Sequence, residues 1–321
     1  MFKMAATRDA YGKTLVDLGK KNKDIVVLDA DLSCSTRTSW FAKEFPDRFF
    51  NVGIAEQNLM GIAAGLALGG KIPFVSTFAM FASGRCWEQI RNSIAYPCLN
   101  VKIAATHAGI TVGEDGATHQ ALEDIAIMRA IPYMSVIVPA DAIAAELTIR
   151  EVARTHGPCY VRMSRGNTPV VYDTYALDFK IGKNNTLKKG KDVTIIACGL
   201  MVSHSIMAAE ELEKENISVA VVDMHTIKPV DKDSIISAAE RTGAIVTAEE
   251  HSVIGGLGST VAEVLSQNKP VPMEMVGIPG VFGESGAPDE LLEKYHLMPK
   301  DIVKAVKKVL IKKEKFLRVK V

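Results

Sequence analysis

Short apolar runs alternate with longer stretches of helical periodicity along most of this chain. The runs are rich in Val and Ile, and they are continuously hydrophobic rather than alternately apolar and polar. Continuous hydrophobicity is typical of strands in a parallel sheet whose two faces are both covered by helices. The pattern therefore predicts an α/β fold with mainly parallel sheets.

The predicted strands fall into two sets, one in each half of the chain. The first set consists of residues 25–28, 74–76, 101–104, 135–138 and 160–163, and the second of residues 193–197, 219–222, 244–248 and 273–276. Between the sets lies a stretch rich in Gly, Asn and Lys, as expected of a domain boundary. A chain of 321 residues is also long enough for two hydrophobic cores. We therefore predict a first domain at residues 1–175, a linker at 176–190 and a smaller second domain at 191–321.

Composition and charge exclude several classes of protein. Hydrophobic residues make up 48% of the chain and charged residues 23%, which excludes an intrinsically disordered protein. The net charge of +1 gives no electrostatic reason to expect a nucleic-acid partner. No apolar run approaches the roughly 20 residues needed to span a bilayer, and the first residues lack the pattern of a signal peptide. We therefore expect a cytoplasmic protein that binds neither membrane nor nucleic acid.

Two further features have a structural explanation that is simpler than a functional one. The glycine-rich turn at residues 255–259 is able to cradle a phosphate, but it does not complete G-x-G-x-x-G, and a helix-packing turn explains it better. Residues 300–321 include nine basic and two acidic residues around an apolar helical stripe. A solvated helix face explains this charge most simply, and a basic partner-binding face is the alternative.

The segment at residues 49–70 combines an acid with a helix of unusually small residues. Glu56 precedes this helix, in which Gly61 and Gly65 lie one turn apart. Each glycine weakens an isolated helix by up to ~1 kcal/mol, so the pair predicts the close approach of another backbone. By position alone, Glu56 is better explained as an acid that stabilises the first helical turn.

A second segment, at residues 105–123, places polar groups in a glycine-rich loop that should follow a strand. It contains His107, Glu114, Asp115 and His119. In open α/β sheets, ligands bind at the carboxyl ends of the strands, where such loops begin. Two imidazoles and a carboxylate suit general acid–base chemistry or the recognition of sugar hydroxyls, although a plain polar loop remains an alternative.

Metal and disulfide sites have little support in this sequence. The spacing of His107 and His119 matches no common zinc pattern. The five cysteines are odd in number, lie far apart and form no C-x-x-C pair. We therefore expect reduced thiols and no metal site formed by this chain alone.

Six short motifs occur in a fixed order along almost the whole chain. They are A-T-R at 6–8, D-A-D-L-S at 29–33, G-I-A-E-Q at 53–57, S-T-F-A-M-F at 76–81, V-G-E-D-G-A-T-H-Q at 112–120 and S-R-G-N at 164–167. Together they resemble the C-terminal half of transketolase, a thiamine diphosphate enzyme that moves two-carbon ketol units between sugar phosphates. The glutamate motif is shared by related thiamine diphosphate enzymes, whereas the V-G-E-D-G-x-T-H-Q string is more specific. The resemblance implies a pyrimidine-binding domain followed by a transketolase C-terminal domain.

The resemblance also implies a missing half. Family members that act as single chains are about twice as long and carry, in an N-terminal domain, a G-D-G motif and an Asn that hold the metal and the diphosphate. No G-D-G occurs in this sequence. The chain therefore resembles the C-terminal subunit of a split enzyme, active only with an N-terminal partner subunit that holds the diphosphate and a divalent metal, Mg²⁺ or Ca²⁺. Two copies of each chain are expected, with the small-residue helix after Glu56 as the candidate symmetric contact.

Four positions match residues around the cofactor in this family. Glu56 matches the glutamate that hydrogen-bonds the aminopyrimidine N1′ of thiamine diphosphate, a cofactor that itself performs the difficult chemistry. Phe78 and Phe81 match aromatic residues around the pyrimidine ring, and Phe81 is the better candidate for stacking on it. Asp31 resembles the acid near the thiazole side, with a buried cap at a strand end as the alternative.

The resemblance assigns the remaining positions to the substrate. His107 and His119 match histidines that contact the donor oxygens and transfer protons, which suits a group that both donates and accepts near neutral pH. Asp115 resembles the carboxylate that reads the acceptor's C2 hydroxyl. The positions that match the site for the sugar's terminal phosphate are Arg8, Ser35 and Arg165, whose donors suit a phosphate.

The resulting prediction is a transferase of ketol groups from ketose phosphates to aldose phosphates, in carbohydrate metabolism of the pentose phosphate type. One alternative is the β chain of a 2-oxo acid dehydrogenase E1 component, which does not need the phosphate-binding set. Another is a 1-deoxyxylulose-5-phosphate synthase-like subunit, which usually has Arg where His107 stands. A regulatory homologue without catalysis is the third.

Overall fold

Strands β2 (Ile25–Asp29) and β5 (Lys102–Ala105) are buried at every position, including the charged residues Asp29 and Lys102, and both coincide with predicted strands. They lie in a seven-stranded sheet with the order β12-β6-β7-β5-β4-β2-β3. The other members are β3 (Phe49–Asn51), β4 (Ile72–Ser76), β6 (Ser135–Ile137), β7 (Cys159–Arg162) and β12 (Thr226–Lys228). All neighbours pair in parallel except β12, which pairs antiparallel with β6. The structure is a computed structural model, and it describes residues 2–173 and 179–319.

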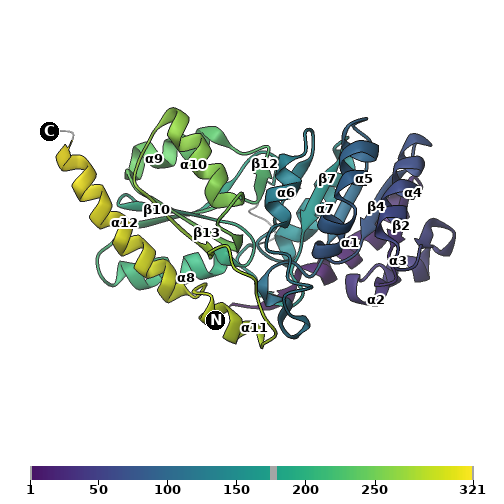
Figure 1. Ribbon diagram of the computed structural model, residues 1–321, viewed down its shortest axis with the longest axis horizontal. Coiled ribbons are helices and arrows are strands. Elements are labelled where there is room, and N and C mark those ends of the chain that lie inside the picture. The colour runs from purple at the N-terminus through teal and green to yellow at the C-terminus, as the bar shows by residue number, and fades with distance from the viewer. Residues whose placement is uncertain (1, 174–178, 320–321) are drawn as a thin grey trace.

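A second sheet lies beside the first and forms the centre of the second domain (Figure 1). Its order is β14-β13-β10-β11-β9. The strands are β9 (Asn185–Lys188), β10 (Val193–Ala197), β11 (Val219–Asp223), β13 (Ile245–Ser252) and β14 (Met273–Ile278). Only β9 runs antiparallel to its neighbour. The predicted α/β fold with two mainly parallel sheets is therefore confirmed.

Helices cover both faces of each sheet. On one face of the first sheet pack α1 (Thr7–Lys21), α3 (Ser39–Glu44) and α7 (Ala142–Arg154), and on the other α4 (Glu56–Leu68), η3 (Ile90–Ala95) and α6 (Asp124–Ala130). Figure 1 shows α9 (Lys232–Thr242) and α10 (Leu257–Asn268) above the second sheet, with α8 (Met201–Glu213) and α12 (Pro299–Val319) below it. The short helices are α2 (Ser33–Thr36), α5 (Trp87–Gln89) and α11 (Pro288–Lys294). One buried apolar cluster continues from the first domain into the α9–α10 side of the second.

The predicted domain boundaries stay a prediction, although part of the predicted linker has a defined structure. Residues 176–178 lie outside the described residues. Residues 185–188 form β9, which pairs with β11 and closes one edge of the second sheet. The search for continuous apolar runs does not predict this strand, because β9 is a partly exposed edge strand whose sequence is mostly polar.

A small two-stranded sheet brings the start of the chain to the end of the first domain. Strand β1 (Met4–Ala6) pairs antiparallel with β8 (Asn167–Pro169), with Ala6 opposite Asn167. The Thr7 hydroxyl also accepts a hydrogen bond from the Ser164 N–H at 3.1 Å. These contacts place the first turn of α1 beside the S-R-G-N motif.

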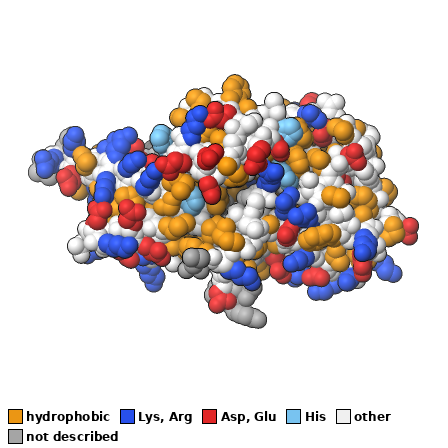
Figure 2. Space-filling model, turned by 90° about the horizontal axis from the view of Figure 1, so that it is seen from below, with side chains coloured by type: hydrophobic (Ala, Val, Ile, Leu, Met, Phe, Trp, Pro, Cys, Tyr) orange, Lys and Arg blue, Asp and Glu red, His pale blue; other side chains and the backbone are white. Residues whose placement is uncertain are grey.

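The basic C-terminal helix α12 uses much of its charge within its own domain. Lys307 pairs with Glu215 at 2.7 Å, and Lys308 and Lys312 both pair with Glu274, at 2.9 and 2.5 Å. Basic side chains crowd the left end of the molecule in Figure 2, where α12 projects. The intramolecular pairs favour the simpler explanation, in which α12 packs its apolar face on the second sheet and exposes its charged face to solvent. Across the described residues, no helix has the length and apolar character needed to cross a membrane.

Candidate active site

Four of the segments that carry predicted site residues meet at the carboxyl ends of parallel strands. Phe78 follows β4 and His107 follows β5, and a backbone bridge joins Phe78 to Thr106. Arg8 comes from the first turn of α1, which the β1–β8 pair holds nearby. Glu56 is the first residue of α4. Strand ends of this kind are the usual ligand sites of open α/β sheets, and charged and His side chains mix near the middle of the face in Figure 2.

Four aromatic rings form one cluster at these strand ends. The rings of Phe78 and His107 stack with centroids 3.8 Å apart, and those of Phe78 and Phe81 lie 6.1 Å apart and nearly parallel. His119 approaches the edge of Phe81, with centroids 5.1 Å apart and an angle of 74°. The two predicted histidines and the two predicted phenylalanines therefore lie together.

The His107 ring is held in one neutral form. Its Nδ1 lies 2.9 Å from Thr106 Oγ1, and Arg8 Nη1 lies 3.4 Å from its Nε2. Because a guanidinium only donates, Nε2 acts as the acceptor and Nδ1 carries the proton. Burial, followed by the positive charges of Arg8 and Arg165, lowers the pKa of His107 to about 3. The ring is therefore uncharged at neutral pH.

This lowered pKa predicts an acid-dependent loss of stability that His107→Asn should reduce. In the unfolded chain, His107 has an ordinary pKa near 6.5 and binds a proton below that pH, whereas in the folded chain it binds a proton only near pH 3. Between these two values the free energy of unfolding therefore decreases as the pH is lowered, by up to ~1.4 kcal/mol per pH unit. Asn does not titrate, and it tolerates the φ of +58° at this position.

The measurement is urea unfolding of the full chain at pH 7 and pH 5. The drop in unfolding free energy should be about 2 kcal/mol smaller in His107→Asn than in the unaltered chain. His296→Asn is the matched control, because His296 has a similar φ of +59° but is exposed. Equal drops in all three proteins would contradict the prediction.

Glu56 is buried, and its side chain is paired with the Arg85 guanidinium. The side chain is 5% exposed, and its Oε1 accepts a hydrogen bond from Arg85 Nη1 at 3.0 Å. The same guanidinium lies over the Phe81 ring, 4.1 Å from its centroid. Glu56 and Arg85 line an open hollow of about 470 Å³ together with Ile54, Ala55, Gln57 and Asn58. A carboxylate and an aromatic face are thus both within reach of one planar cation.

The predicted phosphate-binding residues lie among several guanidinium groups. Arg8 Nη1 donates to the Ser35 carbonyl at 3.0 Å, while its buried Nε has no partner. Burial, together with the nearby charges of Arg37 and Arg165, lowers the pKa of Arg8. Arg165 donates from Nη1 to Glu114 Oε2 and to the Val112 carbonyl, both at 2.6 Å. The structure therefore offers a positive cluster, in which the Ser35 carbonyl accepts from Arg8 and helps to orient it.

Asp31 and Asp115 are exposed, in contrast to Asp29, the other acid of the D-A-D-L-S motif. Asp31 Oδ1 accepts a hydrogen bond from Asn51 Nδ2 at 2.9 Å. The buried cap at this strand end is Asp29, which accepts from the Leu32 N–H at 2.6 Å and from the hydroxyl of Thr36 at 2.7 Å. The alternative considered for Asp31, a buried cap, is therefore the role of Asp29.

Two arginines near the site are not predicted by any motif. Arg85 joins Glu56 to Phe81, and Arg37 binds Asp9 at 2.7 Å while contributing positive charge near Arg8. Arg37 ends α2 in a left-handed conformation with φ of +70°, which no residue pattern in the sequence announces. Among the described residues, no group of three or more His, Cys, Asp or Glu is placed to hold a metal ion.

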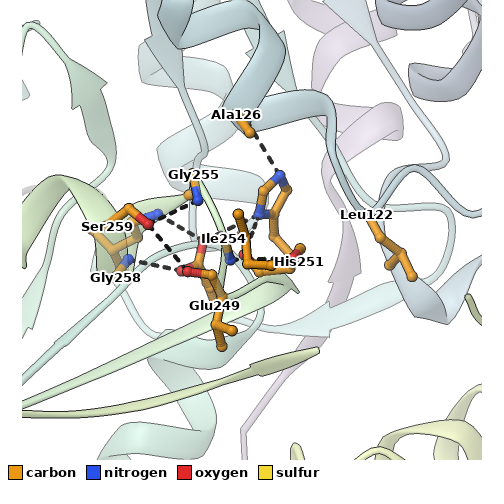
Figure 3. Close-up of polar contacts among 12 residues, drawn as sticks. Leu122, Ala126, Glu249, His251, Ile254, Gly255, Gly258 and Ser259 are labelled. Atoms are coloured by element: carbon orange, nitrogen blue, oxygen red, sulfur yellow. Dashed lines mark hydrogen bonds and ion pairs between the residues drawn. The ribbon is translucent and has the colours of Figure 1, made fainter. Parts of the chain in front are cut away.

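The glycine-rich turn in the second domain is filled by the chain itself. Glu249 accepts hydrogen bonds from the first backbone N–H groups of α10, Leu257 at 2.7 Å and Gly258 at 2.8 Å (Figure 3). Gly256 has no room for a side chain there, because a Cβ would collide with the Glu249 carboxylate. The structure therefore supports the helix-packing explanation over a phosphate cradle.

Comparison with known proteins gives matches along both domains. Residues 3–171 match the family described as transketolase, pyrimidine binding domain, and residues 182–302 match the family described as transketolase, C-terminal domain. A Methanocaldococcus jannaschii protein with the provisional name transketolase C-terminal section is 54% identical over 301 residues, or 93% of this chain and 94% of that protein.

Two further similarities extend over nearly the whole chain. The 6-deoxy-6-sulfo-D-fructose transketolase subunit of a Clostridium species is 44% identical over 302 residues, which cover 94% of each chain. A solved structure described as a split gene transketolase, inactive beta4 tetramer, has a TM-score of 0.90 and 58% identity to this chain. That similarity covers 95% of this chain and 98% of the solved one.

Proposed function

This chain belongs to the transketolase family, and we propose that it is the C-terminal subunit of a split, thiamine diphosphate-dependent transketolase. The observation that carries the proposal is the cluster of Phe78, Phe81, His107 and His119 at the strand ends. Relatives named as a C-terminal section and as a subunit match this chain over 94% of their own length, which supports a separate N-terminal partner.

The residues around Glu56 fit the pyrimidine end of thiamine diphosphate. The Arg85 guanidinium, a flat and nitrogen-rich group, lies over Phe81 and hydrogen-bonds Glu56. An aminopyrimidine ring needs the same two partners, an aromatic face for stacking and a buried carboxylate for hydrogen bonding. When bound, the cofactor supplies the nucleophilic carbon and the electron sink of ketol transfer. Asp31 is proposed to lie near its thiazole side.

In this proposal Glu56 holds a proton at N1′ of the pyrimidine. Its burial and its place at the first residue of α4 fix the direction of the carboxylate. Phe81 orients the ring without competing for protons, and Phe78 supports His107 by stacking on it. These residues position the cofactor and tune its protonation rather than forming bonds to the substrate.

The loop histidines and the arginine cluster are proposed to bind the sugar. His107 is neutral at pH 7, so it accepts or donates a proton at a sugar oxygen without first losing its own charge. His119 faces the same aromatic cluster, and Asp115 on the same loop would read an acceptor hydroxyl. The terminal phosphate would bind at Arg8, Ser35 and Arg165, where Arg8 Nε is buried without a partner. The proposed substrates are therefore ketose and aldose phosphates.

The proposed assembly contains two copies of this chain and two of an N-terminal partner, which would hold the diphosphate and a Mg²⁺ or Ca²⁺ ion. Helix α4 offers the symmetric contact. A Cβ at Gly61 or Gly65 would meet nothing within 4 Å in this chain, so the space they leave is open to another molecule. Ile54 and Leu68, at the two ends of the helix, are 76% and 74% exposed. A two-fold contact across this helix is the commonest way to close such an assembly.

The test is ketol transfer from xylulose 5-phosphate to ribose 5-phosphate, with thiamine diphosphate and Mg²⁺ present. This chain alone is compared with the chain co-purified with its N-terminal partner, and ribose is compared with ribose 5-phosphate as the acceptor. We expect transfer only in the paired sample and a clear preference for the phosphorylated acceptor, since charged hydrogen bonds contribute about 1.5–3 kcal/mol each.

Other outcomes separate the parts of the proposal. A verified, cofactor-loaded pair that transfers no ketol unit but decarboxylates pyruvate would favour the E1 or synthase alternatives. Transfer by this chain alone would exclude the need for a partner. Equal use of both acceptors would leave a split transketolase but remove the phosphate site.

A further inference from the structure

The loop that carries the proposed substrate residues is fastened by the second domain of the same chain. Glu250, near the end of β13, accepts two hydrogen bonds at Oε1 from one residue of this loop, Thr111. The donors are the Thr111 backbone N–H and hydroxyl, both at 2.7 Å. Thr111 lies midway between His107 and Asp115, so this contact is at the centre of the loop.

The same end of β13 also holds the far end of the loop. The Ser252 N–H donates to the Leu122 carbonyl at 2.8 Å, and the Ala126 N–H donates to His251 Nε2 at 3.3 Å. Figure 3 shows His251 pointing from the second domain towards Ala126 on α6. Arg162 Nη2 lies between the two domains and donates to the carbonyls of Ala121 and Glu250. Residues 107–122 are therefore attached at their middle and at their end to one short stretch of β13.

The loop backbone passes directly over the Glu250 carboxylate. Gly109 has φ of +85°, and a Cβ added there would collide with Glu250 Oε1. Glu250 is 3% exposed and Thr111 is 8% exposed. A buried carboxylate is costly unless it is hydrogen-bonded, so the two bonds to Thr111 stabilise both the acid and the loop.

We propose that Glu250 is a positioning residue for ketol transfer, which holds the substrate loop in its working shape from the C-terminal domain. The inference rests on the proposed function, because it assigns the consequence to the reaction of His107, Asp115 and His119. Misplacing a reacting group by 1 Å is able to cost about 10²-fold in rate. The C-terminal domain thereby acquires a task in the reaction, although it contributes none of the predicted site residues.

The chain offers a matched control one residue away. Glu249 is 0% exposed and also accepts two backbone N–H groups, but both belong to α10 in its own domain. Glu250→Gln and Glu249→Gln therefore replace the same acceptor group, a carboxyl, by a weaker one at two buried sites, and only the first touches the loop. Thr111→Val is a third variant, which removes the hydroxyl bond and leaves the carboxylate in place.

The experiment measures kcat and KM of the reconstituted, cofactor-loaded complex for each variant. Hydrogen exchange of the amides at residues 109–122 is measured in parallel on the full chain. Glu250→Gln should lower kcat about tenfold or more and speed exchange at the Thr111 amide about tenfold. Glu249→Gln should change neither by more than about twofold. Thr111→Val should lower kcat less than Glu250→Gln, and the double variant should lose less than the product of the two single losses.

Each outcome decides one of the two ideas. An active complex in which Glu250→Gln has the kcat and the exchange rates of the unaltered protein would overturn the positioning role. So would an equal loss in Glu249→Gln, because it would reveal a general effect of altering a buried carboxyl group. If Glu250→Gln does not fold, unchanged kcat in Thr111→Val would overturn the inference. An unaltered complex without ketol transfer would instead remove the proposed function, and exchange at Thr111 would still decide whether Glu250 holds the loop.

Discussion

Glu56→Gln should lower kcat of the reconstituted complex by about 10²- to 10⁴-fold, the range typical of a lost general acid–base group. Gln has the size of Glu and is able to keep a hydrogen bond, but it does not exchange a proton with N1′ of the pyrimidine. The buried position of Glu56 at the start of α4 leaves no other carboxylate of the described site to replace it at Arg85 and Phe81. The loss should appear in kcat, with KM for both sugars little changed.

The measurement is steady-state ketol transfer, with the complex first checked for subunit composition and bound cofactor. Glu44→Gln serves as the control, because Glu44, at the end of α3, is exposed and forms an ion pair with Lys20. Arg85→Met separates the ion pair from the acid, and it should cost far less because Arg85 is half-exposed. A Glu56→Gln complex with more than a tenth of the normal kcat would contradict the role assigned to Glu56.

Asp124→Ala should destabilise the folded chain by about 3–5 kcal/mol, the usual cost of leaving a buried charge without its partner. Asp124 is 1% exposed at the start of α6, and its Oδ2 accepts from the Tyr160 hydroxyl at 2.7 Å and from Arg162 Nε at 2.8 Å. Arg162 is 5% exposed, so water cannot replace the lost carboxylate. The same substitution leaves the Tyr160 hydroxyl without its acceptor.

Urea unfolding measures this effect against an exposed ion pair in the same chain. Asp17 pairs with Arg150 at 3.1 Å, but its side chain is 53% exposed. Asp17→Ala should therefore cost less than about 1 kcal/mol. Similar losses for the two variants would indicate that the Asp124–Arg162 pair is better hydrated than its burial implies.

The central strands were predictable because each is buried on both faces and therefore reads as one apolar run. β2 and β10 are examples, with every position buried. The edge strands β3, β9 and β12 were not predicted, since each is only three or four residues long and is partly exposed, whereas the edge strand β14 was predicted at residues 273–276. β12 is only three residues long, and it pairs with a strand some ninety positions earlier. No local pattern specifies such a contact.

The candidate site follows a similar division. Its motif residues lie at strand ends, where the sequence places polar groups and glycines together, and Phe78 and His107 meet as expected there. Arg85 and Glu250 were missed because tertiary contacts alone define their positions. Glu250 is 139 residues from Thr111 in the sequence. The sequence gives no sign of which of the two adjacent acids, Glu249 or Glu250, faces the loop.

Strand β12 has a consequence for how this polypeptide is able to be divided. Although it follows β11 in the chain, β12 completes the outer edge of the first sheet beside β6. A gene break at residues 176–190 would strip β6 of this neighbour and expose a row of unpaired N–H and C=O groups, a template for aggregation. A fission between the two domains of this chain would leave an unfinished sheet. We therefore expect the two domains to be inherited and expressed as one unit.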